Sequence, residues 1–404
     1  MIRGNPGLQE SFAQQQVLSP VEMVPTDVNA TTVNGVVKVY VIDGLLDLAL
    51  CTSAMQAFDL RLSACECLKA YFFNHADVRL HFLKRAIEGH RSGIDETANV
   101  LTVLLRPSMD ASASDPYRLW FAALVTFHLL FDNSTAKALA MAVTEGDIST
   151  GEEVITSIQT ISAHLIAGLK RGDDARILVG YLILLIGWLF EDMDAVNDFL
   201  GEGSNVQSII QAVIQSNCGG ELVQGLCAVL LGTVYEFSTK DSPIPRTTLQ
   251  ELLLSRIGRD RYLEKLGKLR GHPLMRDFEV MPQKLDLSGT LPNVFFDGTF
   301  VDFFKDNYSR LGRAIDRDPG MEISVMTNGV QKGISRQLVD SLRGQVEEKD
   351  RALQDARGRL ASVERQLDRE QAEHRRTRDG NAVELSRTKA AHDGLQRRHQ
   401  EEVR

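Results

Sequence analysis

The feature of this sequence that most constrains its fold is a succession of long apolar segments in which hydrophobic residues recur at threefold and fourfold spacing. These segments span residues 53–73, 117–131, 152–170, 175–190 and 221–237. That period is typical of helices with a buried face, and strand signals are few between residues 36 and 270. The sequence therefore predicts an all-α region.

Several of these helices belong to a repeat. A long apolar helix ends in an aromatic residue, and a short polar break and a second amphipathic helix follow it. The marker residues Phe73, Phe131 and Phe190 are 58 and 59 residues apart, and Phe237 ends a fourth long helix. This spacing exceeds that of armadillo or HEAT units, so each unit needs an extra helix or loop. Units of this kind stack into an α-solenoid whose concave surface serves as a docking platform.

Helix start signals agree with the periodicity. Asp115 and Pro116 fit a cap followed by a proline in the first turn. Thr150 with Glu153, and Thr248 with Glu251, have the spacing of capping boxes. We therefore expect helices to begin at these three places.

Residues 271–334 form a predicted connector that contains one aromatic helix over residues 299–316 and closes the head. Its stripe includes Phe300, Phe303 and Phe304, with Tyr308 on the same helix. Such a stripe inserts into a partner's groove or packs on the open end of the solenoid as a cap. The second interpretation is favoured because the repeats need a terminal cover.

Heptads begin near residue 335 and predict a coiled coil over residues 335–404. The predicted core residues are Val339, Leu342, Val346, Leu353, Leu360, Val363 and Leu367. Valine at the first core position favours a two-stranded coil. Beyond Leu367 the core positions become His374 and Asn381, so the coil weakens or changes register there.

The block from Tyr235 to Arg246 is a candidate docking site. An apolar helix ends in an aromatic and acidic triplet, and two prolines stiffen the connection that follows. Its candidate partner-binding residues are Tyr235, Glu236, Phe237, Pro243, Pro245 and Arg246. The alternative interpretation is a plain loop between two helices.

Composition and motifs exclude several function classes. Residues 335–404 hold 16 Lys+Arg and 14 Asp+Glu, which leaves 29 Lys+Arg and 40 Asp+Glu in the first 334 residues. This part is therefore acidic and unsuited to binding nucleic acid.

There is no Gly-Lys-Ser/Thr phosphate loop, HExxH or GxSxG motif, and the five cysteines include no CxxC pair. His75 and His81 are six residues apart, on different helix faces. The apolar run 177–190 is shorter than the roughly 20 residues of a membrane span. We expect no enzyme, no metal site and no cofactor.

Three blocks resemble the general vesicular transport factor family. They are LLGTVYEFSTKDSPIPR at 230–246, LLLSRIGRDRYLEKLGKLR at 252–270 and FVDFFKDNYSRLGRAIDRDP at 300–319. The resemblance covers essentially the whole chain, with its most specific matches in the first and third blocks. It implies that residues 1–270 are the C-terminal part of a longer armadillo-like head, and that residues 335–404 begin a longer coiled-coil tail.

The resemblance also implies a function. The family's members are vesicle tethering factors in traffic between the endoplasmic reticulum and the Golgi and within the Golgi. A cytoplasmic homodimer is implied, peripheral on Golgi and transport vesicle membranes, with a Rab-type GTPase, SNAREs and other Golgi tethers as partners. The family's further coil and acidic C-terminal tail are not in this sequence, so none of their activities is assigned to it.

Two other interpretations stay open. One is a different α-solenoid adaptor or scaffold with coiled-coil dimerisation, which would need a ladder of asparagine or tryptophan for an extended peptide. The sequence contains only Trp120 and Trp188. The other is a structural coiled-coil protein that dimerises without any membrane or GTPase.

Overall fold

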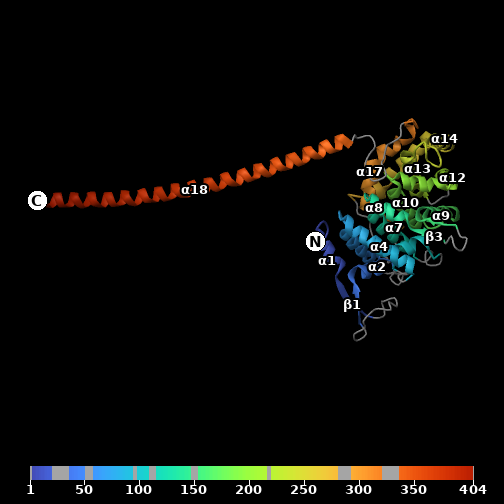
Figure 1. The fold of residues 1–404 in the computed structure, drawn as a ribbon, viewed down its shortest axis with the longest axis horizontal. Coiled ribbons are helices and arrows are strands. Elements are labelled where there is room, and N and C mark those ends of the chain that lie inside the picture. The colour runs from blue at the N-terminus through green and yellow to red at the C-terminus, as the bar shows by residue number, and fades with distance from the viewer. Residues whose placement is uncertain are drawn as a thin grey trace. The chain divides into compact units, whose positions relative to one another are not determined.

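The computed structural model describes residues 2–20, 36–50, 58–93, 98–108, 115–146, 153–215, 220–280, 293–320 and 336–403. The chain divides into two compact units, residues 1–332 and 333–404. The first unit is built from helices and carries the core, and the second is a single long helix (Figure 1).

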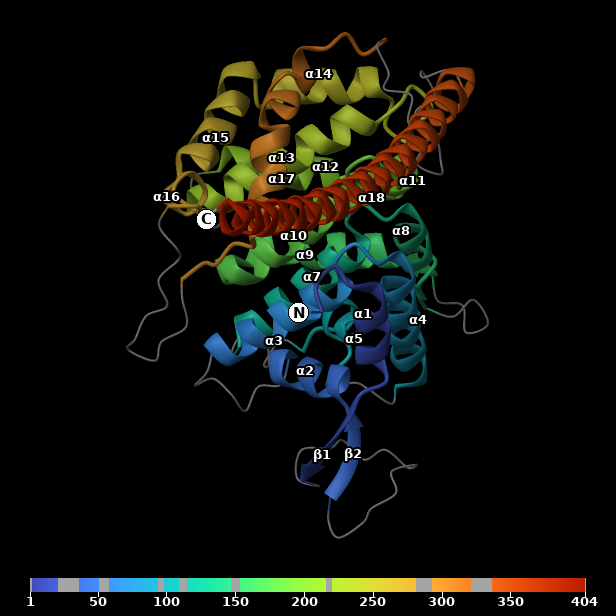
Figure 2. The same cartoon turned by 90° about the vertical axis from the view of Figure 1, so that its left-hand side faces the viewer.

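Long helices form the central layer of the first unit. They are α3 (Phe58–Phe72), α7 (Pro116–Leu130), α10 (Ala175–Leu189) and α13 (Gly220–Phe237). Each packs against the next in chain order, and α15 (Arg259–Gly271) packs on α13 (Figure 2). The prediction of an all-α solenoid is therefore confirmed. In α10 every side chain from Ile177 to Leu189 is buried, as its uniformly apolar sequence requires.

Further helices flank this layer and connect its members. They are α1 (Pro6–Ala13), α2 (Val41–Leu50), α4 (Ala76–Ser92), α5 (Val100–Leu105), α8 (Ser134–Met141), α9 (Ser157–Arg171), α11 (Met193–Gly201), α12 (Ser204–Ile214), α14 (Arg246–Arg256) and α16 (Pro273–Arg276). The unit ends in α17 (Gly298–Gly312) and the 3-10 turn η4 (Ala314–Asp316). No helix in the described ranges is long and apolar enough to cross a membrane.

Two small antiparallel sheets interrupt the helices. Strand β1 (Gln16–Pro20) pairs with β2 (Val36–Tyr40), and β3 (Thr144–Glu145) pairs with β4 (Ile155–Thr156). The sequence analysis did not predict either sheet. The valine-rich run from Val36 to Val41 carries a strand signal that the surrounding helical periodicity obscures.

The expected helix starts have three outcomes. Helix α7 begins as predicted, with Asp115 as its N-cap and Pro116 in its first turn. The predicted capping box of Thr248 and Glu251 was wrong, because α14 already begins at Arg246, after Pro245. Thr150 lies outside the described residues, and the capping box that starts α9 is formed by Thr156 and Gln159 instead.

The second unit is the helix α18 (Arg336–Glu402), which is continuous over 67 residues. Of the predicted coil core, Leu353, Leu360, Val363 and Leu367 are between 49 % and 62 % exposed on this single helix. The side chains of Val339, Leu342 and Val346 lie outside the described ones. The coiled coil stays a prediction.

Candidate partner-binding surface

The polar break after each aromatic marker has one geometry in the first three repeats. The residue after the marker has a left-handed backbone, and the next residue caps the following helix by accepting a hydrogen bond from the backbone N–H three positions on. The left-handed residues are Asn74, Asp132 and Glu191, and the caps are His75, Asn133 and Asp192. The break is therefore a tight structural turn.

A ladder of donors, two of them buried and Arg79 half-buried, joins these repeats. The last carbonyls of a helix have no partner within it, so other groups must satisfy them. Gln9 Nε2 lies 2.8 Å from the Phe73 carbonyl oxygen, Arg79 Nη1 lies 2.7 Å from that of Phe131, and Lys137 Nζ lies 2.6 Å from that of Phe190. Each donor stands four residues after an N-cap and closes the end of a neighbouring long helix.

At the fourth turn, at the end of α13, the closing donor is Arg246, which belongs to the following helix α14. Its Nη1 donates to the carbonyls of Tyr235, Glu236 and Ser238, and its guanidinium lies 4.2 Å from the centre of the Tyr235 ring. Arg246, Tyr235, Glu236 and Phe237 are all buried. These four candidate residues therefore hold the end of α13, and Pro243 and Pro245 are the exposed members of the block.

We call residues 293–317 the strap, because they cross the long helices. Phe303 packs edge-on between Phe131 and Phe190, with ring centres 5.6 Å and 4.8 Å away. Phe300 meets Phe127, and Phe295 lies against Phe58 and Trp120. The candidate residues Phe300, Phe303 and Phe304 are therefore buried against other parts of the same chain. Tyr308 is partly covered by Phe304 and Arg270. The strap lies across the repeats, whereas we had expected a cap on their open end.

An ionic anchor holds the beginning of the strap. Asp297 caps α17 and is buried, with Lys69 Nζ at 2.6 Å and His128 Nε2 at 3.1 Å from its carboxylate. Burial alone would raise the pKa of Asp297, but hydrogen bonds and charges from His128 and Lys69 outweigh burial and hold this pKa well below its usual range. The anchor ties α17 to α3 and α7.

A second ionic anchor holds the end of the strap at the candidate block. The buried Glu236 carboxylate lies 2.8 Å from Arg310 Nε and 2.5 Å from Arg317 Nη1. Arg310 also pairs with Glu191 at 3.0 Å and lies over the rings of Phe190 and Phe237. Arg310, Arg317 and Asp297 were not predicted from the sequence. The signal for the two arginines is Glu236, because an acidic residue inside an apolar helix needs a cation from elsewhere in the chain.

The exposed part of the candidate block is a rigid loop. Ser242 Oγ donates to Asn197 Oδ1 at 2.7 Å and accepts from the Thr239 backbone N–H at 2.9 Å. The Arg246 backbone N–H donates to the Thr239 carbonyl at 3.0 Å. These bonds fix the loop from Thr239 to Arg246 and leave Pro243 and Pro245 facing solvent. Such a fixed loop presents a surface without an ordering cost on binding.

Side chains capable of metal binding do not converge in the described part of the chain. No group of three or more His, Cys, Asp or Glu residues in the described ranges could hold a metal ion. His75 and His81 both line a hollow of about 620 Å³ between α1, β2 and α4. The His75 ring already contacts Glu10 and accepts the capping hydrogen bond from the Val78 backbone N–H.

Comparison with known proteins gives one family. A family model described as "Uso1 / p115 like vesicle tethering protein, head region" matches residues 5–315. The intracellular protein transport protein USO1 of Saccharomyces cerevisiae is 28% identical over 368 residues, which are 80% of this chain and 20% of that protein. The general vesicular transport factor p115 of Homo sapiens is 26% identical over 313 residues, which are 76% of this chain and 31% of that protein.

Solved structures agree with these relatives. The crystal structure of Uso1-2 has a TM-score of 0.66 and 28% sequence identity, and the match covers 79% of this chain and 48% of that one. The structure titled Uso1-1 gives the same TM-score at 27% identity. The chain spans between a fifth and a third of the length of the two curated relatives described above.

Proposed function

This chain belongs to the family of Uso1/p115-like vesicle tethering proteins, and from that premise we propose that it is a dimeric tether in traffic between the endoplasmic reticulum and the Golgi and within the Golgi. The family is one of tethering and transport factors and not of enzymes. The observation that carries the proposal is the match of the head model to almost the whole helical unit, residues 5–315.

The proposed dimer is supported by the pattern along α18. Exposed Leu353, Leu360 and Leu367 recur every seventh residue and leave an apolar stripe that a second helix would cover. In a parallel, in-register pair the flanking positions bring Arg359 opposite Glu364 of the other copy, and this attractive pair favours the parallel orientation. At 1.5 Å per residue the helix is about 100 Å long, a stiff spacer between bound membranes.

We assign the partners from the family's role in vesicle tethering. The tether associates peripherally with Golgi and vesicle membranes, binds a Rab-type GTPase, and meets SNAREs and other Golgi tethers. Residues 1–270 act as the repeat head, 271–334 as its closing connector and 335–404 as the start of the coil. Two linked heads raise the effective concentration at a membrane, so weak single contacts suffice.

The rigid loop from Thr239 to Arg246 is the docking element we assign to the head. Its exposed prolines stand on a framework of buried bonds, so a partner can bind them without a change in the solenoid. The buried residues of the same block act as its support.

Co-sedimentation tests this function. The purified chain is mixed with Golgi-derived membranes and a GTP-loaded or GDP-loaded Rab protein, and the bound fraction is measured. We expect recruitment that requires the GTP form, and a loss of most of it in Pro243→Arg but not in the matched variant Ser255→Arg on the exposed face of α14. A folded chain that no membrane or Rab recruits would refute the tether. Recruitment that survives Pro243→Arg would refute only the role of the loop.

A further inference from the structure

A groove between α4 and α8 arises because two equivalent helices differ in length. Their N-caps, His75 and Asn133, occupy the same place in successive repeats. Helix α4 has 17 residues and α8 has 8, so the end of α8 at Met141 corresponds to Leu83 of α4. Beyond that point no described helix of the next repeat runs beside α4; strand β3 follows α8, and its Glu145 pairs with His90 near the end of α4.

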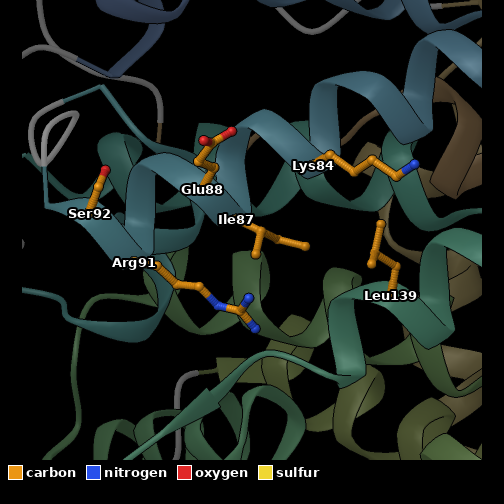
Figure 3. A pocket seen from close by; sticks show the side chains of 6 residues that line it. All are labelled: Lys84, Ile87, Glu88, Arg91, Ser92 and Leu139. Carbon is orange, nitrogen blue, oxygen red and sulfur yellow. The ribbon is translucent and has the colours of Figure 1, made fainter.

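The residues of α4 that line the resulting hollow all come after Leu83. They are Lys84, Ile87, Glu88, Arg91 and Ser92, and Leu139 of α8 faces them across a volume of about 530 Å³ (Figure 3). Leu139 is partly exposed and packs at the edge of the core. The hollow therefore lies beside α4 where α8 ends, and Ile87 and Leu139 form its apolar floor.

Charged side chains flank this floor. Lys84 and Arg91 are exposed and stand two turns apart on α4, about 10.5 Å along its axis. Neither forms an ion pair or side-chain hydrogen bond with any residue that the structure describes. Glu88 also borders the groove, but Figure 3 shows its carboxylate turned away from the gap between Ile87 and Leu139. The groove thus offers a ligand two cations that no residue in the described part of the chain pairs.

We propose that this groove binds an acidic amphipathic helix of a partner protein, which lies in line with α8 and completes the layer beside α4. Carboxylates seven residues apart on that helix meet Lys84 and Arg91, and an apolar side chain between them packs on Ile87 and Leu139. Charge complementarity selects this occupant, because Lys84 and Arg91 flank the groove and the Glu88 carboxylate turns away from it. The inference does not rest on vesicle tethering.

The probe is a fluorescein-labelled helical peptide that carries two glutamates seven residues apart with leucines between them. A matched peptide carries lysines at those two positions. Fluorescence anisotropy is measured with the full chain, with the double variant Lys84→Glu/Arg91→Glu, and with the control Lys170→Glu/Arg256→Glu, which reverses two exposed cations on α9 and α14. Circular dichroism establishes that each variant is folded.

We expect the acidic peptide to bind the wild-type chain and the control pair equally, and to lose about tenfold or more in affinity for Lys84→Glu/Arg91→Glu. The lysine peptide should gain affinity for that variant, which a merely structural role of the two residues would not produce. The proposal is overturned if the acidic peptide does not bind the wild type, if the control pair loses as much, or if the reversal changes neither peptide's affinity.

Discussion

Single side chains close the C-terminal ends of the long helices, and they do so with different chemistry in each repeat. Gln9 of α1, Arg79 of α4 and Lys137 of α8 reach the ends of α3, α7 and α10, and Arg246 of α14 reaches the end of α13. In the third repeat the equivalent position is Val196, which has no donor. This loss explains why the fourth turn recruits Arg246 and the strap.

Lys137 makes the ladder sensitive to pH. Burial lowers the pKa of Lys137 to about 8, although Asp192, Asp132 and Glu191 act to raise it. The unfolded lysine keeps a pKa of about 10.4, so between those values the unfolded chain binds more protons and the contribution of Lys137 to stability rises with pH. The neutral amine still donates to the Phe190 carbonyl.

We therefore expect the free energy of unfolding of the wild type, relative to Lys137→Gln, to increase by roughly 1–3 kcal/mol between pH 7 and pH 10. Urea titrations of both proteins at each pH measure the difference. A difference in the free energy of unfolding between the two proteins that stays constant or narrows over this range would contradict a lowered pKa of the buried Lys137.

Glu236 carries the other prediction at this scale. Glu236→Gln keeps the shape of the side chain but leaves Arg310 and Arg317 without their shared carboxylate, so we expect a loss of about 3 kcal/mol in the free energy of unfolding. Urea denaturation measures it, with Glu264→Gln as the matched control in an exposed i,i+4 pair with Lys268. Equal effects of the two variants would show that Glu236 is not an anchor.

Among the elements, the strap stands out because it covers helices that are distant in sequence. Its aromatic residues fill the space between successive marker residues, and its ionic anchors hold both ends. The surface of the long helices under the strap is therefore closed to partners, and docking on this unit must use other faces. This differs from the open platform that the repeats suggested.

Phe303→Ala tests the strap. The variant removes a ring packed against both Phe131 and Phe190, so we expect a loss of about 3–5 kcal/mol and faster tryptic cleavage at Arg310 and Arg313. The control Asp302→Ala changes an exposed neighbour on the same helix. Unchanged cleavage in Phe303→Ala would mean that the strap is not held by this contact.

Periodicity predicted the long helices and the aromatic helix of the strap well, because both signals lie within about 20 residues of chain. The predicted range 299–316 compares with α17 at 298–312 followed by η4. The placement of the strap could not be predicted, because its anchors join residues from 74 to 228 positions apart. The predicted capping box at Thr248 was wrong because α14 begins two residues earlier, at Arg246, with Pro245 as its N-cap.

Helix α18 carries a prediction of its own. Leu360→Lys places a charge in the proposed core, whereas Ser362→Lys adds the same charge at an exposed position that faces away from it. We expect the wild type and Ser362→Lys to be dimers and Leu360→Lys to be a monomer in sedimentation equilibrium at micromolar concentration. A dimer that persists in Leu360→Lys would place dimerisation outside this seam.

At the scale of the whole molecule, the proposed tether has a strap-closed head followed by a long helix, and we propose that this helix pairs with a second copy. In this proposal the head makes the membrane and GTPase contacts, and the coil links it to a second head. Tethering then needs no bond to be made or broken, only two linked sites at a fixed reach.

The most direct test of this claim is a clustering measurement with Golgi-derived membranes and transport vesicles that carry different fluorophores. With GTP-loaded Rab present, the wild-type chain and Ser362→Lys should bring the two labels together, whereas Leu360→Lys should bind each membrane but not join them. Clustering by Leu360→Lys at the wild-type level, or none by a membrane-bound wild-type dimer, would contradict the account.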